Sequence, residues 1–244
     1  MTKEKAMTAA EPTAIAEPMV NSARGFENFK SEDLIIPRLR LLQGLSEAVV
    51  SGSGKMGQFQ DSLTGEILGE GVEIVLLGMQ NGAVYFESGE GMRCKSGDGI
   101  TNMEGVKCVD CPFNQYYGTR WKKDEEPPKC SATKEFVCVT KGTVEGSEQR
   151  PIVVSFLKTS YKMGKKLASI ARLSGRDIFA ASYSITSEMM KNKKGTYAIM
   201  NVKQCGWLKP EELAAAEAWY HTLGQSNVVV HEASEQVDEG SDII

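Results

Sequence analysis

The pattern of hydrophobic and polar positions predicts a protein built mainly from β-strands. Residues 72–79 form a dense apolar run, and residues 83–87 continue it beyond two glycine positions. Because glycine tolerates sharp bends in strands, we interpret the two runs as halves of one long, bent first strand. Residues 135–140 and 151–157 have the same apolar, β-branched character, so they predict a second and a third strand.

Helical spacing follows the third predicted strand. Thr159 and Ser160 offer a cap, and the apolar residues after them recur every three to four positions. These apolar residues of the first helix are Met163, Leu167, Ile170 and Ala171. Two more strands are predicted over 179–190 and 196–204, joined by a basic turn. Pro210 then begins a second helix.

The order of predicted elements is strand, strand, strand, helix, strand, strand, after a short hairpin at 55–68. A five-stranded barrel with its helix between the third and fourth strands is the OB-fold. We therefore predict a mainly β fold, an OB-fold-like five-stranded barrel with two helices, over 31–210. An ordinary antiparallel sheet with one packed helix fits the same order. Residues 1–30 lack periodicity and predict a disordered arm. A C-terminal helix is predicted at 211–224, and the residues after it, 225–244, predict a disordered acidic tail.

Four cysteines lie in a loop between the first two predicted strands, at about residues 88–134. Cys108 and Cys111 are separated by two residues, and Cys94 and Cys130 flank them. The loop is rich in Gly, Pro, Asp and Lys, so it has too few large apolar residues to bury a core of its own. Four thiolates around one tetrahedral Zn²⁺ would hold it. The sequence therefore predicts a structural zinc ribbon inserted into the barrel.

Other uses of the cysteines have less support in the sequence. An iron–sulfur cluster takes the same four thiolates, and spacing does not distinguish it. A redox Cys-x-x-Cys is usually found beside a βαβ pattern, and a zinc deaminase needs a His-x-Glu element; the sequence has neither. Cys138 and Cys205 fall within and at the end of predicted strands, so we interpret them as packed core thiols. Cys138 would replace Cys130 as a ligand if its strand began late.

Aromatic and basic residues gather in the cysteine loop. Single-stranded nucleic acids are bound by cations that neutralise phosphates and by aromatic faces that stack on bases. An aromatic side chain packed in the core is the ordinary alternative, and for Lys162, Lys165 and Lys166 a solvated helix face is the simpler interpretation. The candidate nucleic-acid contacts are Tyr85, Phe86, Phe113, Tyr116, Tyr117, Arg120, Trp121, Lys122, Lys123, Lys158, Tyr161, Lys193 and Lys194.

The net charge of −4 is unevenly distributed. Residues 31–210 carry 24 basic and 20 acidic residues, whereas 211–244 carry eight acidic residues and no Lys or Arg. A basic body with an acidic tail is typical of nucleic-acid binders that also recruit partners, although acidic ends also serve solubility. The candidate partner-binding residues are Asp238, Glu239, Asp242, Ile243 and Ile244.

No apolar run is long enough to cross a bilayer, and the first residues lack the apolar core of a signal peptide. We therefore expect no membrane partner and a cytoplasmic location, in the host cell if the chain is phage-encoded. The sequence contains no P-loop, no His-Glu-x-x-His and no ligand set with an open metal position, which argues against an enzyme.

These features resemble the single-stranded DNA-binding proteins encoded by bacteriophages. The likeness rests on the strand order, the four-cysteine insertion and the acidic tail with its apolar tip. A four-cysteine ribbon between the first two OB strands is also similar to the zinc-bearing domain of eukaryotic replication protein A. Bacterial single-stranded DNA-binding proteins likewise end in acidic residues followed by apolar ones. Their tip is Pro-Phe, whereas this chain ends in Ile243 and Ile244.

The resemblance implies a non-catalytic protein that coats single-stranded DNA during phage replication or recombination. Its tail would recruit replication or recombination proteins, and the protein could form homo-oligomers. A zinc-ribbon protein–protein adaptor or transcription factor acting on a polymerase is the second hypothesis. Retained partner binding without Tyr116, Tyr117 and Trp121, together with no nucleic-acid affinity, would favour the adaptor.

Overall fold

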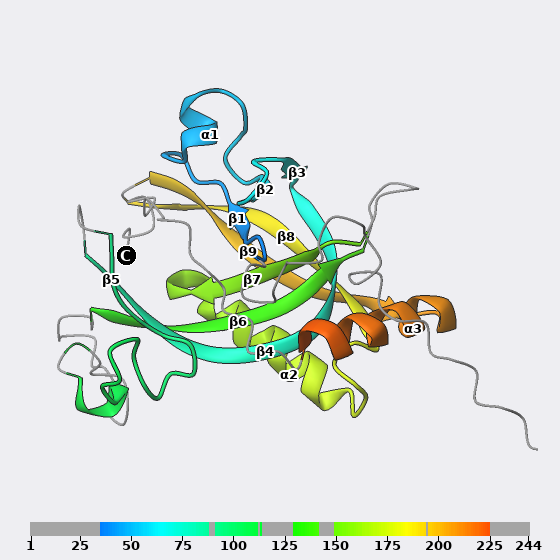
Figure 1. The fold of residues 1–244 in the computed structure, drawn as a ribbon. Helices are drawn as coiled ribbons and strands as arrows, with labels where there is room; N and C mark the ends of the chain where they lie inside the picture. The colour runs from blue at the N-terminus through cyan, green and yellow to red at the C-terminus, as the bar shows by residue number, and fades with distance from the viewer. Residues whose placement is uncertain are drawn as a thin grey trace, which may run out of the picture.

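The computed structural model describes residues 35–87, 91–111, 113, 129–141, 149–193 and 195–224. Antiparallel strands dominate this part of the chain and form two sheets (Figure 1). The prediction of a mainly β fold with few helices is therefore confirmed. No helix among the described residues is long and apolar enough to span a membrane.

The larger sheet is built around one long strand. Its strand order is β7-β6-β4-β8-β9, and β5 pairs with the far half of β4. As predicted, β4 is a single strand of 17 residues with an irregularity between Leu76 and Gly78, so it can pair with β8 at its start and with β5 at its end. The strands are β4 (Gly71–Glu87), β5 (Gly91–Ser96), β6 (Cys130–Thr140), β7 (Pro151–Leu157), β8 (Ala181–Asn192) and β9 (Gly195–Trp207).

The helices lie where the sequence predicted them. Helix α2 (Tyr161–Leu173) connects β7 to β8 and follows a single 3-10 turn, η4 (Lys158–Ser160). Ser160 occupies the N-cap position, but its side chain makes no capping hydrogen bond. Helix α3 (Pro210–Trp219) begins at the predicted proline and continues as the wider turn η5 (Tyr220–Gly224).

The predicted barrel does not close, because the edge strands β7 and β9 are not neighbours in the sheet. The segment before the sheet lies between them instead. The amide of Val153 in β7 donates to Pro37 O at 2.8 Å, and the side chain of Gln43 bonds the backbone of Ala198 in β9. This segment belongs to a small sheet that includes the predicted hairpin: β1 (Leu39–Leu41), β2 (Phe59–Asp61) and β3 (Ile67–Gly69), with the short α1 (Glu47–Val50) between β1 and β2.

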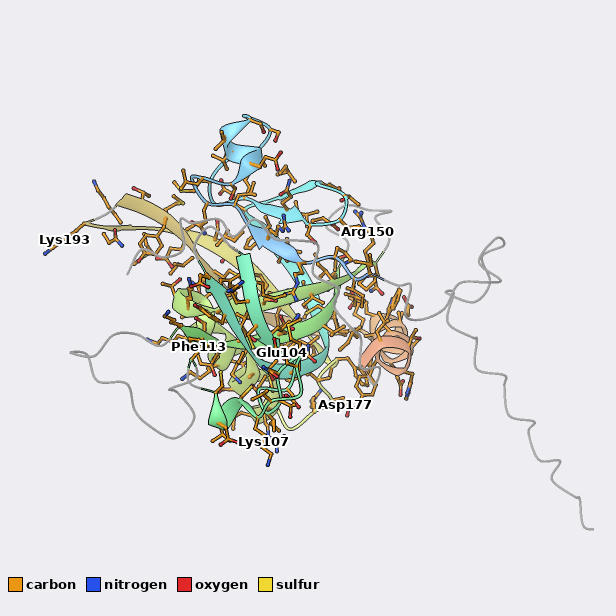
Figure 2. The ribbon with its side chains drawn as sticks, turned by 60° about the vertical axis from the view of Figure 1, so that its left-hand side comes forward. Glu104, Lys107, Phe113, Arg150, Asp177 and Lys193 are labelled. Carbon is orange, nitrogen blue, oxygen red and sulfur yellow. The ribbon has the colours of Figure 1, made fainter. Side chains whose placement is uncertain are left out.

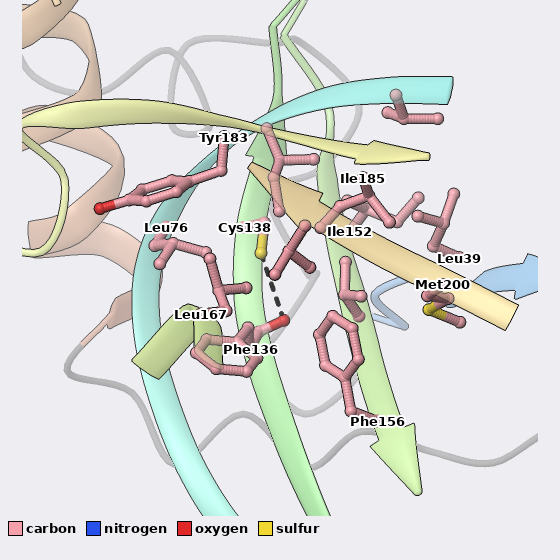
Figure 3. Packing of buried hydrophobic residues seen from close by; sticks show 14 of the residues in the cluster. Leu39, Leu76, Phe136, Cys138, Ile152, Phe156, Leu167, Tyr183, Ile185 and Met200 are labelled. Atoms are coloured by element: carbon pink, nitrogen blue, oxygen red, sulfur yellow. Dashed lines mark hydrogen bonds between the residues drawn. The ribbon is translucent and has the colours of Figure 1, made fainter. Parts of the chain in front are cut away.

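Apolar side chains fill both faces of the larger sheet. The main core lies between the curved strands and α2, whose Leu167 is fully buried against Phe136 and Phe156 (Figure 3). Cys138 is 0% exposed within it and its thiol donates to Phe136 O at 3.4 Å, so the prediction of a core thiol is confirmed. A second cluster on the other face lies beneath α3 and η5 and includes Ile36.

Candidate nucleic-acid interface

The cysteine loop is attached to the sheet by the far ends of β4, β5 and β6. We call residues 91–113 and 129–130 the cysteine lobe. Cys94 in β5 and Cys130 in β6 are both register partners of Tyr85 in β4. Because directly opposed residues of antiparallel strands point to the same face, the three side chains share one face of the sheet. Tyr85 and Cys130 are buried there, and Cys94 packs against them.

Backbone hydrogen bonds organise the rest of the lobe. The Cys-x-x-Cys pair spans a single 3-10 turn, η3 (Cys108–Asp110), in which Cys111 N donates to Cys108 O at 3.2 Å. The Cys108 amide donates to Ile100 O at 2.7 Å. The Cys130 amide donates to Phe113 O at 3.1 Å, which places the lobe's aromatic residue beside the start of β6.

A short turn at the lobe's base is held by Asp98. Its Oδ1 accepts hydrogen bonds from the amides of Ile100 and Thr101 and from the hydroxyl of Ser96. The bond from Thr101, followed by those from Ile100 and Ser96, lowers the pKa of Asp98. The turn therefore keeps its anionic acceptor at neutral pH and directs the chain from β5 towards η3 and the Cys-x-x-Cys pair.

The four predicted ligands lie at the same end of the sheet and interact electrostatically. Burial, together with negative charge at Cys94, Cys108 and Cys111, raises the pKa of Cys130 to about 11. Thiolates gathered in this way repel one another unless a cation joins them.

The four thiols are not arranged as a set of metal ligands. Among the described residues, no group of three or more His, Cys, Asp or Glu side chains is arranged to hold a metal ion. Tyr85 stands between Cys94 and Cys130 in the sheet, so two strand spacings of roughly 4.8 Å separate the backbones of the two cysteines.

An aromatic pair covers the same face. Phe113 stacks on Tyr85 with ring centroids 5.1 Å apart, and Lys129 Nζ lies 5.6 Å from the centre of the Phe113 ring. Phe113 is 43% exposed whereas Tyr85 is only 7% exposed. Tyr85 therefore supports Phe113 from below, and Phe113 is the ring that a ligand could reach. Phe86, the next residue of β4, is half-buried and points to the other face.

Two further candidates lie at the start of α2. Lys158 has φ +46°, a conformation found at no other described residue besides glycine. Tyr161 is half-buried, and the side chains of Lys134 and Lys165 lie over its ring at 5.9 and 5.2 Å. The sequence interpretation had assigned Lys165 to a solvated face and had named neither Lys129 nor Lys134 as a nucleic-acid contact.

The other predicted residues are distributed differently. Lys193 is exposed at the tip of the β8–β9 hairpin, at a different corner from the labelled lobe residues Phe113 and Lys107 in Figure 2. Tyr116, Tyr117, Arg120, Trp121, Lys122, Lys123, Lys194 and the tail residues Asp238, Glu239, Asp242, Ile243 and Ile244 lie outside the described residues.

The interpretation of Cys205 as a packed thiol is wrong. Its side chain is exposed. The pairing of β8 with β9 shifts at this point: Tyr183 faces Gln204 and Ser182 faces Gly206, which leaves Cys205 as an unpaired bulge residue. Such a residue departs from the alternation on which the prediction depended.

Comparison with known proteins places the chain in a family. The sequence matches the family described as Pam3 phage gp34-like protein over residues 2–229. The chain belongs to this family. A phage origin, which the resemblance implied, is thus supported, and the family description itself names no ligand or activity. No curated protein and no solved structure matches the chain.

Proposed function

We propose that this gp34-like protein binds single-stranded DNA during phage DNA replication or recombination and catalyses no reaction. The observation that carries the proposal is the exposed ring of Phe113, supported from below by Tyr85 and accompanied by Lys129. An exposed ring with a cation beside it is the combination that holds one base and its phosphate. A ring that served only the core would be buried.

The strand order supports the same function. The order β7-β6-β4-β8-β9, with α2 between β7 and β8, agrees with the OB-fold connectivity that the sequence predicted, with the two edge strands apart. In OB-folds, the loops after the first and the fourth strand bind oligonucleotides. Here those loops are the cysteine lobe and the basic tip of the β8–β9 hairpin, which includes Lys193.

A structural Zn²⁺ held by Cys94, Cys108, Cys111 and Cys130 would complete the lobe. The ion would neutralise part of the thiolate charge and lock the backbone that carries Phe113. A ring fixed in advance loses less conformational freedom when a base stacks on it. The acidic tail would recruit replication or recombination proteins of the phage or its host.

The test is titration of fluorescently labelled oligo-dT by anisotropy at two salt concentrations, with duplex DNA alongside. We expect tight binding of oligo-dT that weakens steeply with salt, and weaker binding of the duplex. Phe113→Ala should weaken binding about tenfold, because one stacked base contributes roughly 1–3 kcal/mol.

Val109→Ala is the matched control, since Val109 is an exposed apolar residue of the same lobe with 61% of its surface accessible. Its affinity should stay within about twofold of the wild type, because a surface truncation away from the ring changes free energies little. Equal affinity for duplex and single strands, or unchanged affinity in Phe113→Ala, would contradict the proposal.

One observation favours the adaptor as a second function. Four large apolar side chains of the lobe are between 46% and 69% exposed, which is typical of a surface that contacts another protein. These exposed side chains are those of Ile100, Met103, Val106 and Val109. If the adaptor function is correct, Val109→Ala will weaken capture of the partner protein, and neither Val109→Ala nor Phe113→Ala will bind DNA.

A further inference from the structure

Two lysines from different elements meet above one tyrosine ring. Lys134 comes from β6, and Tyr161 and Lys165 come from the first turns of α2. Lys165 Nζ lies 5.2 Å and Lys134 Nζ 5.9 Å from the centre of the Tyr161 ring. Residues four apart lie on the same side of a helix, so Tyr161 and Lys165 point together towards β6.

Gly164 makes this meeting possible. A Cβ atom at position 164 would lie 2.7 Å from Phe156 Cβ and 3.1 Å from Lys134 Cβ, which is closer than carbon atoms pack. Helix α2 therefore lies against β6 and β7 at a distance that only glycine allows. Lys134 is also held from the sheet side, where its Nζ donates to Asn81 Oδ1 at 2.6 Å.

The described residues offer these two charges no acidic partner. Within the described part of the chain, no carboxylate forms a salt bridge with Lys134 or Lys165. Burial lowers the pKa of Lys134, and the charge of Lys165 lowers it further. The first turn of α2 contains no acidic residue and receives no side-chain cap from Ser160, so its amides add positive potential nearby. A bound anion would relieve this repulsion.

The geometry points to a phosphate-binding site formed by Lys134 and Lys165 beside the Tyr161 ring, with Asn81 orienting Lys134. The assignment rests on the proposed function, because the phosphate is that of a single-stranded DNA backbone. Lys165 offers three donors to phosphate oxygens, Lys134 offers the two that its bond to Asn81 leaves, and the ring offers a face to a neighbouring base or sugar.

The site lies on the same path as Phe113. Strand alternation places Cys130, Ala132 and Lys134 on one face of β6, and Phe113 lies over that face at Cys130. Four residues of strand separate the two positions by roughly 13 Å. A short extended oligonucleotide that stacks a base on Phe113 would thus carry its backbone past Lys134 towards α2.

The salt dependence of oligo-dT binding tests the site. Each phosphate contact contributes about 0.7 to the slope of log affinity against log salt for single strands. The double variant K134Q/K165Q should therefore reduce the magnitude of the slope by about 0.7, because the two lysines share one phosphate. The control K162Q/K203Q removes the same charge from two exposed lysines, on α2 and β9, that are not among the cations over the Tyr161 ring, and it should leave the slope unchanged.

Asn81→Ala provides a second variant that keeps both charges. It removes the acceptor that holds Lys134, so we expect weaker binding of oligo-dT with an unchanged salt slope. Thermal unfolding of each variant establishes that the fold is retained. If K134Q/K165Q binds oligo-dT with the wild-type slope, the phosphate site is wrong and the DNA-binding function stands.

Inorganic tripolyphosphate separates the two proposals further. We expect it to shift the lysine side-chain NMR signals of the wild type and of K162Q/K203Q, but not those of K134Q/K165Q. If tripolyphosphate binds in this way while oligo-dT does not bind at all, the anion site stands and the DNA-binding function is wrong. If neither probe binds the wild type, both are wrong.

Discussion

Lys134 and Glu135 are neighbours in β6, yet their side chains enter opposite electrostatic environments. Lys134 lies on the sheet face that α2 covers, where Lys165 lies over the same tyrosine ring. Glu135 lies on the other face, 5% exposed, where it pairs with Arg38 at 3.0 Å and accepts a hydrogen bond from Gln80. Burial opposes ionisation, but Arg38, Lys95 and these hydrogen bonds outweigh it and lower the pKa of Glu135 below its usual 4.5. At the residue scale, the carboxylate stabilises the fold.

Glu135→Gln should lower the free energy of unfolding by about 3 kcal/mol at neutral pH, because it removes the charge that pairs with the largely buried Arg38. The native pKa of Glu135 is lower than the unfolded one, so its stabilisation is complete above about pH 5 and is lost as the pH falls through the native pKa. Urea unfolding at a series of pH values should show the difference between wild type and variant shrinking in acid.

Glu66→Gln is the control, since Glu66 pairs with Arg150 at 2.9 Å with both side chains 49% exposed. Removing an exposed pair should cost less than about 1 kcal/mol at every pH. A wild-type-to-variant difference for Glu135 that did not change with pH would show that its charge is not what stabilises the fold.

At the scale of elements, the cysteine lobe and the sheet are supported differently. The sheet has large buried apolar clusters on both faces, whereas the cluster at the base of the lobe contains only Ala83, Tyr85, Cys94 and Cys130, with Phe113 stacked on Tyr85. Loss of a metal should therefore loosen the lobe and leave the sheet folded.

Elemental analysis of the purified protein should give about one zinc per chain, held tetrahedrally by thiolates. The variant C108S/C111S should lose it, and limited proteolysis should then cut the lobe while the sheet keeps its thermal unfolding transition. Cys205→Ser should keep its zinc, because the exposed Cys205 lies on β9, outside the lobe. Iron in place of zinc would support a cluster, and metal retained by C108S/C111S would exclude these ligands.

The elements could be predicted where the chain's own pattern defines them. The bent β4, the β2–β3 hairpin and α2 follow from alternation, turn residues and helical spacing, which are local properties. Contacts between distant segments could not be predicted in this way. The pairing of Arg38 with Glu135, the meeting of Lys134 with Lys165 across Gly164 and the bulge at Cys205 all depend on how the strands are placed in space.

At the scale of the whole molecule, the gap between β7 and β9 is the main departure from the predicted barrel. A free strand edge exposes unpaired amides and carbonyls. The segment at 36–43 supplies partners to both edges: Pro37 O accepts from Val153 in β7, and Gln43 both donates to and accepts from the backbone of Ala198 in β9, at 3.0 Å each. One side chain thus replaces a pair of strand hydrogen bonds.

Gln43→Ala should lower the free energy of unfolding by roughly 2 kcal/mol, because it removes two hydrogen bonds of about 1 kcal/mol each. The urea midpoint should fall with no change in the slope of the transition, since the surface exposed on unfolding is the same. Gln60→Ala removes one exposed bond to Gly65 O in the neighbouring hairpin and should cost less than about 1 kcal/mol. Equal midpoints for the two variants would show that the gap is held by the apolar contacts of Ile36 and Leu39 rather than by Gln43. A larger decrease in the free energy of unfolding in Gln43→Ala would show that the Gln43 side chain bridges the gap, in place of direct hydrogen bonds between β7 and β9.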